Sequence, residues 1–284
     1  MSSQTVPLEH HPASRLDPRR VRRAMGRAAP VENDDFLAFV NQRLVERVTE
    51  IRLDFPAILE LGRVPGHAAQ LLRAQLPDAR VIAQGLAAPR PEAWSTSATP
   101  QDPNPPCALV GDPVKLPFAT NTFDLVIANM TLHWSADAMR ALREIRRVLK
   151  PGAPLLLVTM GPATLSECRA VLAEIDQARH GQVWPRIPEF FSLADLGDLL
   201  GLAGLARPVV DREMIRPRFE DVEHLLFELR RIGATNAHRR RPPGLMGKGT
   251  LRELARRCDP RQADPSATGL PVTLEILFAH AWKP

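Results

Sequence analysis

The sequence contains no tyrosine, three cysteines and four lysines among its 284 residues. The missing tyrosine excludes any mechanism that needs a phenol. The cysteines, Cys107, Cys168 and Cys258, are scattered along the chain and form no CxxC motif. This spacing argues against a disulfide framework and suits a reducing compartment. Because lysine is rare, the positive charge is carried almost wholly by arginine.

Long hydrophobic runs are also missing. The densest apolar run, residues 154–160, has the length of a strand, whereas a membrane-spanning helix needs about 20 apolar residues. The first eleven residues contain no apolar core of the kind found in signal peptides. We therefore expect a cytoplasmic protein that does not enter a membrane.

The overall composition is that of an ordinary globular protein. Hydrophobic residues make up 44% and charged residues 24% of the chain, and 37 Lys and Arg against 32 Asp and Glu give a net charge of +5. A chain of this length can form one large α/β domain with an appended lobe. The modest positive charge favours acidic partners in general and does not single out nucleic acid.

Predicted strands and helices alternate along most of the chain. Residues 1–32 are polar and rich in proline, which predicts a mobile N-terminal arm before a domain that spans 33–284. Alternating strands and helices indicate an α/β fold with a doubly wound, Rossmann-like, mostly parallel sheet. We expect the late strands to form an antiparallel C-terminal edge hairpin, and lid insertions at about 161–205 and 218–258. The predicted strands are 57–62, 79–83, 107–110, 123–128, 155–159, 209–215 and 272–282; the predicted helices begin near 33, 66, 137, 164, 193, 220 and 251.

In such a sheet the ligand lies beyond the carboxyl ends of the strands, so the residues that follow each strand matter most. Each residue at these strand ends has a plainer explanation when it is taken alone. The glycines suit turns, Asp112 suits the start of a turn before Pro113, and His133 and Trp134 suit packing. The residues at these strand ends are Glu60, Gly62, Gly66, Gly85, Gly111, Asp112, Asn129, Met130, His133 and Trp134.

Taken together and in order, these segments are more specific. The run from Asp112 to Trp134 resembles the central signature of class I S-adenosylmethionine-dependent methyltransferases (methyltransferase type 11), and residues 141–152 continue the resemblance. Residues 195–204, 229–236 and 270–282 are similar to the subgroup that holds the malonyl-acyl-carrier-protein O-methyltransferases of biotin synthesis. Methyltransferase-like assembly factors of respiratory complex I are similar over the same stretches. The resemblance covers about residues 19 to 283.

The resemblance implies S-adenosylmethionine as cofactor and assigns residues to its parts. Glu60, Gly62 and Gly66 would lie under the methionine and ribose, Gly111 and Asp112 would face the adenine, and Asn129 with Met130 would line the methyl-transfer side. Substrate contacts would come from His133, Trp134, Arg230 and Arg231. For the two arginines a solvated basic surface is the alternative.

The sequence departs from the family pattern in its cofactor motifs. Val64, followed by Pro65, stands where the family has a glycine, and Gly85 stands where it has an acidic residue that binds both ribose hydroxyls. Loss of a charge-assisted acceptor costs about 1.5–3 kcal/mol, or roughly 10- to 150-fold in affinity. Gln84 offers a neutral replacement. The N-terminal substrate arm also lacks the tyrosine of the family.

A carboxylate substrate needs no general base, because it is ionised at neutral pH, so we expect no catalytic side chain and no metal. The sequence thus predicts a monomeric methyltransferase that esterifies the free carboxylate of a malonyl thioester on an acyl-carrier protein in biotin synthesis. The alternative is a catalytically degenerate binding or assembly protein of the same fold, like the complex I assembly factors. The altered cofactor motifs favour that alternative, and the intact central signature favours the enzyme.

Overall fold

The computed structural model describes residues 15–28, 35–62, 67–88, 107–244, 246–262, 264 and 266–284. Most of the predicted N-terminal arm before residue 15, the loop with Val64 and Gly66, and the proline-rich stretch 89–106 lie outside these ranges. Within them, no helix combines the length and the apolar character that crossing a membrane requires.

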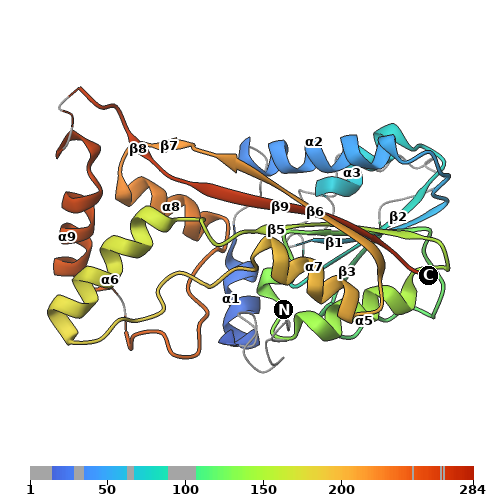
Figure 1. Ribbon diagram of the computed structural model, residues 1–284, viewed down its shortest axis with the longest axis horizontal. Helices are drawn as coiled ribbons and strands as arrows, with labels where there is room; N and C mark the ends of the chain where they lie inside the picture. Colours follow the sequence, from blue (N-terminus) through green and yellow to red (C-terminus); the bar gives the residue numbers. More distant parts are fainter. Residues whose placement is uncertain are drawn as a thin grey trace, which may run out of the picture.

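A seven-stranded sheet in the order β3-β2-β1-β4-β5-β9-β6 forms the centre of the molecule (Figure 1). Strands β1 to β5 pair in parallel, while β9 lies antiparallel to both β5 and β6. The predicted sheet with its antiparallel C-terminal edge is therefore confirmed. The strands are β1 (Ala57–Gly62), β2 (Arg80–Gly85), β3 (Cys107–Val110), β4 (Leu125–Asn129), β5 (Pro154–Met160), β6 (Ala206–Ile215) and β9 (Leu274–Trp282).

Helices cover both faces of this sheet, which explains why its central strands are buried and mostly apolar. All seven residues of β5 and all five of β4 are buried, as expected for parallel strands between two helical layers. Helices α2 (Asp35–Glu50) and α3 (His67–Gln75) pack on one face. On the other face lie α5 (Ala138–Val148), which Asp137 caps at its N-terminus, and α7 (Leu193–Leu202).

A second, smaller core lies at one end of the molecule (Figure 1). Helices α6 (Ser166–His180), α8 (Val222–Arg231) and α9 (Lys248–Cys258) pack there with the short strands β7 (Arg218–Phe219) and β8 (Leu270–Pro271). We call this unit the lid. The predicted lid ranges also included α7, but α7 buries its leucines against the sheet because its apolar side faces α5 and β6, so it belongs to the sheet layers.

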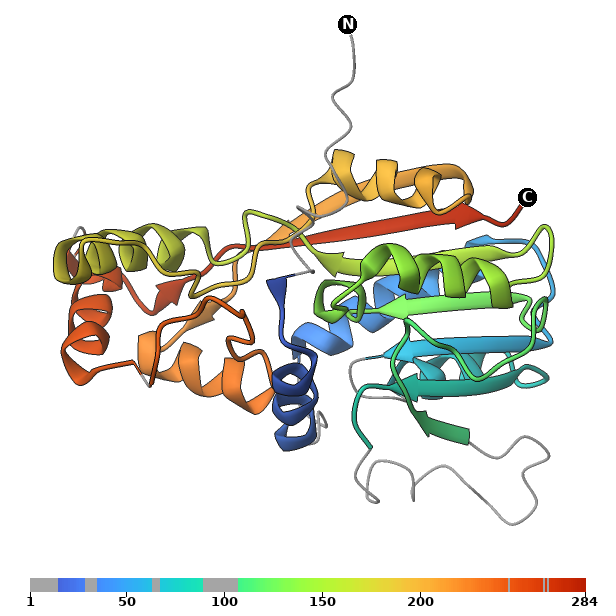
Figure 2. The same cartoon turned by 90° about the horizontal axis from the view of Figure 1, so that it is seen from below.

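Residues 18–27, within the predicted mobile arm, form helix α1 (Pro18–Arg27). Pro18 does not prevent this helix, because proline is well suited to the first turn, where its missing N–H costs no hydrogen bond. The side chain of Asp17 caps the helix by accepting from the Arg19 backbone N–H. Val21 and Met25 are buried in a small cluster with Leu86, which follows β2, and with Ala237, which follows α8. Helix α1 therefore lies between the sheet and the lid (Figure 2).

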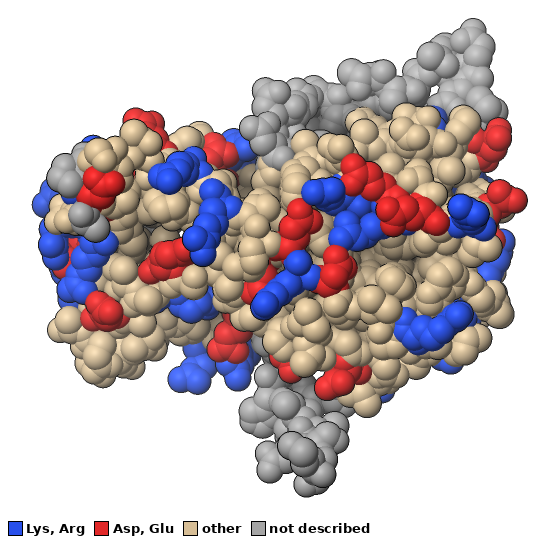
Figure 3. Space-filling view, turned by 45° about the horizontal axis from the view of Figure 1, so that its top comes forward, with Lys and Arg blue, Asp and Glu red and all other residues tan. Residues whose placement is uncertain are grey.

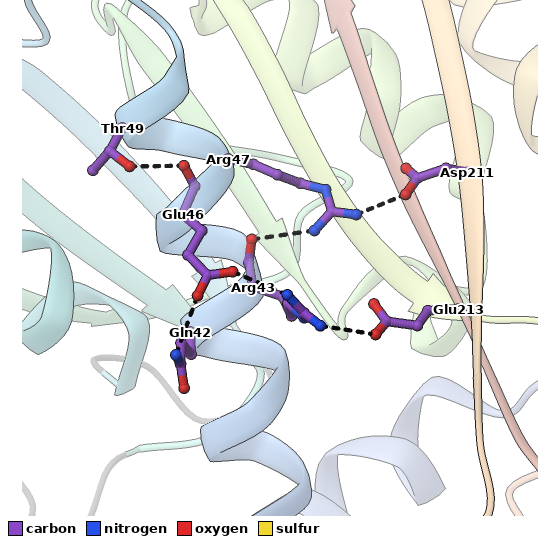
Figure 4. Close-up of polar contacts among 7 residues, drawn as sticks. All are labelled: Gln42, Arg43, Glu46, Arg47, Thr49, Asp211 and Glu213. Atoms are coloured by element: carbon purple, nitrogen blue, oxygen red, sulfur yellow. Dashed lines mark hydrogen bonds and ion pairs between the residues drawn. The ribbon is translucent and has the colours of Figure 1, made fainter.

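Ion pairs connect α2 to the edge strand β6, as Figure 4 shows. Arg47 lies 2.6 Å from Asp211, and Arg43 lies 3.3 Å from Glu213. The Arg47 guanidinium also stacks 3.9 Å above the centre of the Phe278 ring. These ion pairs hold the edge strand β6 against helix α2. On the face shown in Figure 3, positive and negative side chains lie interspersed.

Replacing Arg47 with methionine is expected to lower the free energy of unfolding by about 1 kcal/mol, since it removes an ion pair and a cation–π contact that are each worth up to about 1 kcal/mol at exposed sites. The comparison variant, Arg43→Met, removes two longer ion pairs, to Glu46 and Glu213 at 3.3 Å each, and a wider contact with the Phe39 ring at 5.4 Å, so it should cost less. Urea denaturation of both variants measures the difference. An equal or larger loss for Arg43→Met would contradict this account of the α2–β6 contact.

Candidate cofactor and substrate site

The carboxyl ends of four parallel strands meet at one edge of the sheet. Gly62, the last residue of β1, is paired with Gly85 on one side and with Asn129 on the other. The Gly111 N–H donates to the Gly85 carbonyl at 2.9 Å, which brings the end of β3 to the same edge. The structure thus brings together the glycines and the asparagine that the sequence analysis selected, whereas Gly66 lies outside the described residues.

Glu60 supports this edge by holding the start of α3. Its side chain is fully buried, and its carboxylate accepts from the backbone N–H groups of Ala68 and Ala69 at 3.2 and 3.1 Å. Free N–H groups in the first turn of a helix attract a carboxylate. The first turn of α3 is therefore anchored to β1 by a contact that the sequence analysis did not predict.

The turn after β4 has a strained backbone that is held from both sides. Met130 is buried and has a φ of 50°, a left-handed conformation that is unfavourable for a side chain of this size. Its N–H donates to the Val158 carbonyl at 2.9 Å, and the Thr131 hydroxyl donates to the Leu61 carbonyl at 2.9 Å. These bonds fix the direction in which Asn129 leaves the strand.

Asp112 begins a turn, as its plainer interpretation predicts. One carboxylate oxygen accepts from the Val114 N–H at 3.2 Å. The other lies 3.3 Å from Nη2 of Arg22 on α1, in an ion pair whose Asp112 side chain is 26% exposed. The carboxylate proposed for the adenine is therefore accessible, and α1 reaches it.

Two residues of α5 hold the loop that carries Asp112, and the sequence analysis missed them. Glu144 accepts from the Leu116 N–H at 2.9 Å, while Arg147 donates to the carbonyls of Leu116 and Phe118 at 3.0 and 2.7 Å. The hydrogen bond from Arg147 lowers the pKa of Glu144. Their spacing of three residues on one helix face was the available signal, but only the fold shows that this face meets the loop.

His133 and Trp134 are both buried in the short helix η3 (Leu132–Trp134), as the packing interpretation predicts. The His133 Nδ1 lies 2.9 Å from the Thr159 hydroxyl, and its ring contacts those of Trp134 and Phe190 at centroid distances of 5.3 and 5.7 Å. Trp134 packs in the cluster of α1. These two residues therefore join the end of β4 to α1 and to the loop before α7.

The remaining predicted substrate residues lie at the C-terminal end of α8. Arg231 forms a 2.6 Å ion pair with Glu228, one turn earlier on the same helix, while Arg230 is exposed. The next turn of the chain, at Gly233, lies against Ala24 and Ala28. This end of the lid therefore meets α1.

Comparison with known proteins identifies the family. Residues 59–157 match the family model described as a methyltransferase domain. A malonyl-[acyl-carrier protein] O-methyltransferase of Methylovorus sp. (strain MP688) is 34% identical over 275 residues, covering 95% of this chain and 90% of its own length. The chain belongs to the class I S-adenosylmethionine-dependent methyltransferases. A second relative with the same name, from Gallionella capsiferriformans, is 32% identical and covers 95% of this chain and 92% of its own length.

Solved structures agree with this methyltransferase fold. The YcgJ protein of Bacillus subtilis aligns with a TM-score of 0.56 at 16% identity, over 86% of this chain and 97% of its own. A putative methyltransferase of Bacillus halodurans C-125 aligns with a TM-score of 0.54 at 16% identity, over 86% and 99%. At this level of identity the likeness supports the fold alone.

The residues present fit the S-adenosylmethionine that this methyltransferase family uses. Gln84, next to the missing acid, is 2% exposed, and neither atom of its amide has a hydrogen-bond partner among the described residues. A Cβ at Gly111 would lie 2.9 Å from the Gln84 Nε2, so the glycine leaves room for this amide. The Oδ1 of Asn129 is likewise buried and unpaired within the described ranges. Buried polar atoms that lack a protein partner are costly, and a polar ligand at this edge would satisfy them.

Replacing Asp112 with alanine is expected to weaken binding of S-adenosylhomocysteine at least several-fold, because an ionised hydrogen-bond acceptor for the adenine amino group is lost. Calorimetric titration measures the change. Arg22→Ala is the matched control: it frees Asp112 from its ion pair and should leave the affinity equal or higher. Unchanged affinity in Asp112→Ala would contradict the assignment of this pocket.

Proposed function

We propose that this methyltransferase esterifies the free carboxylate of a malonyl thioester carried by an acyl-carrier protein, a step of biotin synthesis. One observation carries the proposal: the relatives named malonyl-[acyl-carrier protein] O-methyltransferase match 95% of the chain, so the similarity includes the lid as well as the cofactor half. A substrate would have to lie between these two parts to reach the ends of the strands.

The proposed cofactor contacts follow the strand ends. The backbone at Gly62, Gly85 and Gly111 allows close approach, Asp112 accepts from the adenine amino group, and Asn129 with Met130 lines the side of methyl transfer. Glu60 acts indirectly, since it holds the start of α3. Gln84 supplies a neutral amide near the position where the family has an acid.

The chemistry needs alignment more than acid–base help. S-adenosylmethionine supplies an electrophilic methyl group on a sulfonium. A carboxylate oxygen forms a bond to that methyl carbon while the carbon–sulfur bond breaks, which leaves a neutral methyl ester and a neutral thioether. No proton moves, so a general base is not required. The protein's task is to hold the carboxylate in line and to exclude water.

An acidic carrier protein would be attracted by the arginines of the lid. Arg230, Arg239 and Arg240 are exposed, and the net charge of the chain is +5. Such charges increase the rate of encounter and orient the partner more than they add affinity.

Incubation with S-adenosylmethionine and malonyl-carrier protein tests the proposal. Mass spectrometry of the carrier protein should show the gain of one methyl group, and acetyl-carrier protein, which has no free carboxylate, should remain unmodified. If the enzyme binds the cofactor but leaves malonyl-carrier protein unmodified, malonyl-carrier protein is not its substrate and the proposal is wrong.

A further inference from the structure

Arg169 on α6 is half-buried, and its side-chain hydrogen bonds to the described residues all go to backbone oxygens. Its guanidinium donates to the carbonyls of Ile187 and Pro188, both at 3.1 Å, and to that of Thr164 at 3.4 Å. No carboxylate in the described parts of the chain forms an ion pair with it, and burial lowers its pKa. A buried guanidinium without a counter-charge is costly unless an anion joins it.

Glu189 follows the two carbonyls that hold Arg169. Its carboxylate forms a two-point ion pair with Nη1 of Arg15, at 2.7 and 2.8 Å. The negative charge of Glu189 also acts on Arg169 and on His238, where it opposes part of the effect of burial on each pKa. Glu189 thus pairs directly with Arg15, and it lies near enough to Arg169 and His238 to affect their pKa.

His238 supplies an unused donor beside this pair. Only 4% of the residue is exposed. Its Nδ1 accepts from the Arg240 N–H at 3.0 Å, so the proton of the neutral ring lies on Nε2, which is buried and has no partner among the described residues. Burial lowers the pKa of His238, which favours this neutral form. A backbone bridge between Leu16 and His238, with the Arg239 N–H donating to the Arg15 carbonyl at 2.8 Å, places His238 beside the segment that carries Arg15.

This group of residues adjoins the methyl-transfer side of the sheet. Phe190, the residue after Glu189, has its ring 5.7 Å from that of His133, which follows the turn after β4. Phe190 also packs against the apolar cluster that contains Met130. Arg15, Arg169 and His238 come from three separate parts of the chain: the segment before α1, helix α6, and the loop after α8.

We propose that Arg15, Arg169 and His238 bind the free carboxylate of the malonyl thioester. In the free enzyme the Glu189 carboxylate occupies the position of that substrate carboxylate, and the substrate displaces it. The inference rests on the proposed function. Guanidinium groups bind carboxylates with charge-assisted, often paired hydrogen bonds. Methylation turns the carboxylate into a neutral ester, which loses these bonds, so Glu189 returns and the product leaves.

The first test is Arg169→Gln. Loss of a charge-assisted bond is expected to raise the KM for malonyl-carrier protein about tenfold or more, with unchanged affinity for S-adenosylhomocysteine. Arg179→Gln is the matched control on the same helix. Arg179 donates to the Gly249 carbonyl of α9 at 3.3 Å rather than to the loop that carries Glu189. The control should leave KM unchanged. An unchanged KM in Arg169→Gln overturns the assignment of Arg169.

The second test is Glu189→Gln, for which the proposal predicts the opposite sign. Removal of the competing charge should tighten binding of malonyl-pantetheine several-fold, measured by calorimetry with S-adenosylhomocysteine present, while binding of the methyl ester of malonyl-pantetheine stays unchanged. If Glu189 only anchors Arg15, malonyl-pantetheine will bind equally or more weakly, which overturns the proposal. A wild-type enzyme that methylates malonyl-carrier protein, with both variants unchanged, rejects this inference alone. A wild-type enzyme that does not methylate it rejects the proposed function as well.

Discussion

Replacing Asp176 with alanine is expected to lower the free energy of unfolding of the lid by about 3–5 kcal/mol, the usual cost of removing one partner of a buried ion pair. Asp176 on α6 is fully buried, and its carboxylate accepts from Nη2 and Nε of Arg186 at 2.6 and 2.8 Å. The Trp184 N–H lies 3.4 Å from the same carboxylate. The variant would leave the guanidinium of Arg186, whose side chain is 11% exposed, buried without a counter-charge.

Urea denaturation followed by tryptophan fluorescence measures this loss, because Trp184 lies beside the pair. The matched control replaces both partners, Asp176→Leu with Arg186→Met. Since no charge is then left unpaired, the double variant should recover most of the stability that Asp176→Ala loses. A loss below about 1 kcal/mol in Asp176→Ala would show that the pair is a solvent-screened contact, contrary to its burial.

The second large effect is expected at Gly85. Replacement of Gly85 by aspartate should tighten binding of S-adenosylmethionine about 10- to 150-fold, because it restores the charged acceptor that the family pattern places there for the ribose hydroxyls. Gly85 is the last residue of β2, paired with Gly62 and Val110, so its backbone is extended and does not itself require glycine. The new carboxylate would lie at the edge where the other cofactor residues meet.

Calorimetric titration of Gly85→Asp and of its neutral isostere Gly85→Asn separates charge from shape. The asparagine variant should gain much less, since its hydrogen bonds lack charge assistance. Adding Val64→Gly to Gly85→Asp should strengthen binding further; Val64 itself lies outside the described residues. If Gly85→Asp gains nothing, the ribose is held elsewhere and the pocket differs from the family pattern.

Local sequence patterns predicted the sheet well. Strands such as β5 are mostly apolar and are followed by turn residues, so their positions follow from the chain itself. The glycines and Asn129 could be placed at one edge because parallel strands present their carboxyl ends together. Helix α1 was missed because the polar, proline-rich composition of residues 1–32 suggested a mobile arm, whereas Pro18 occupies the first turn of a helix.

The contacts that shape the site join segments far apart in the sequence, and no local pattern reveals them. Arg15 and Glu189 are separated by 174 residues, and the Leu116 backbone meets Glu144 only because α5 folds back on its loop. The buried, unpaired amide of Gln84 also needed the fold, since the sequence shows a polar residue in a strand but not its surroundings. Arg230 and Arg231 were selected from their charge, while Arg169 gave no signal that distinguished it from other helix arginines.

We expect the carboxyl edge of this sheet to bind S-adenosylmethionine although the acid of the family pattern is missing at Gly85. Calorimetric titration of the full chain with S-adenosylmethionine and S-adenosylhomocysteine measures this binding. The expected result is one site per chain with affinity in the micromolar range, weakened in Asp112→Ala. Absence of binding at millimolar ligand would contradict it and would point instead to a methyltransferase fold that serves to bind other proteins.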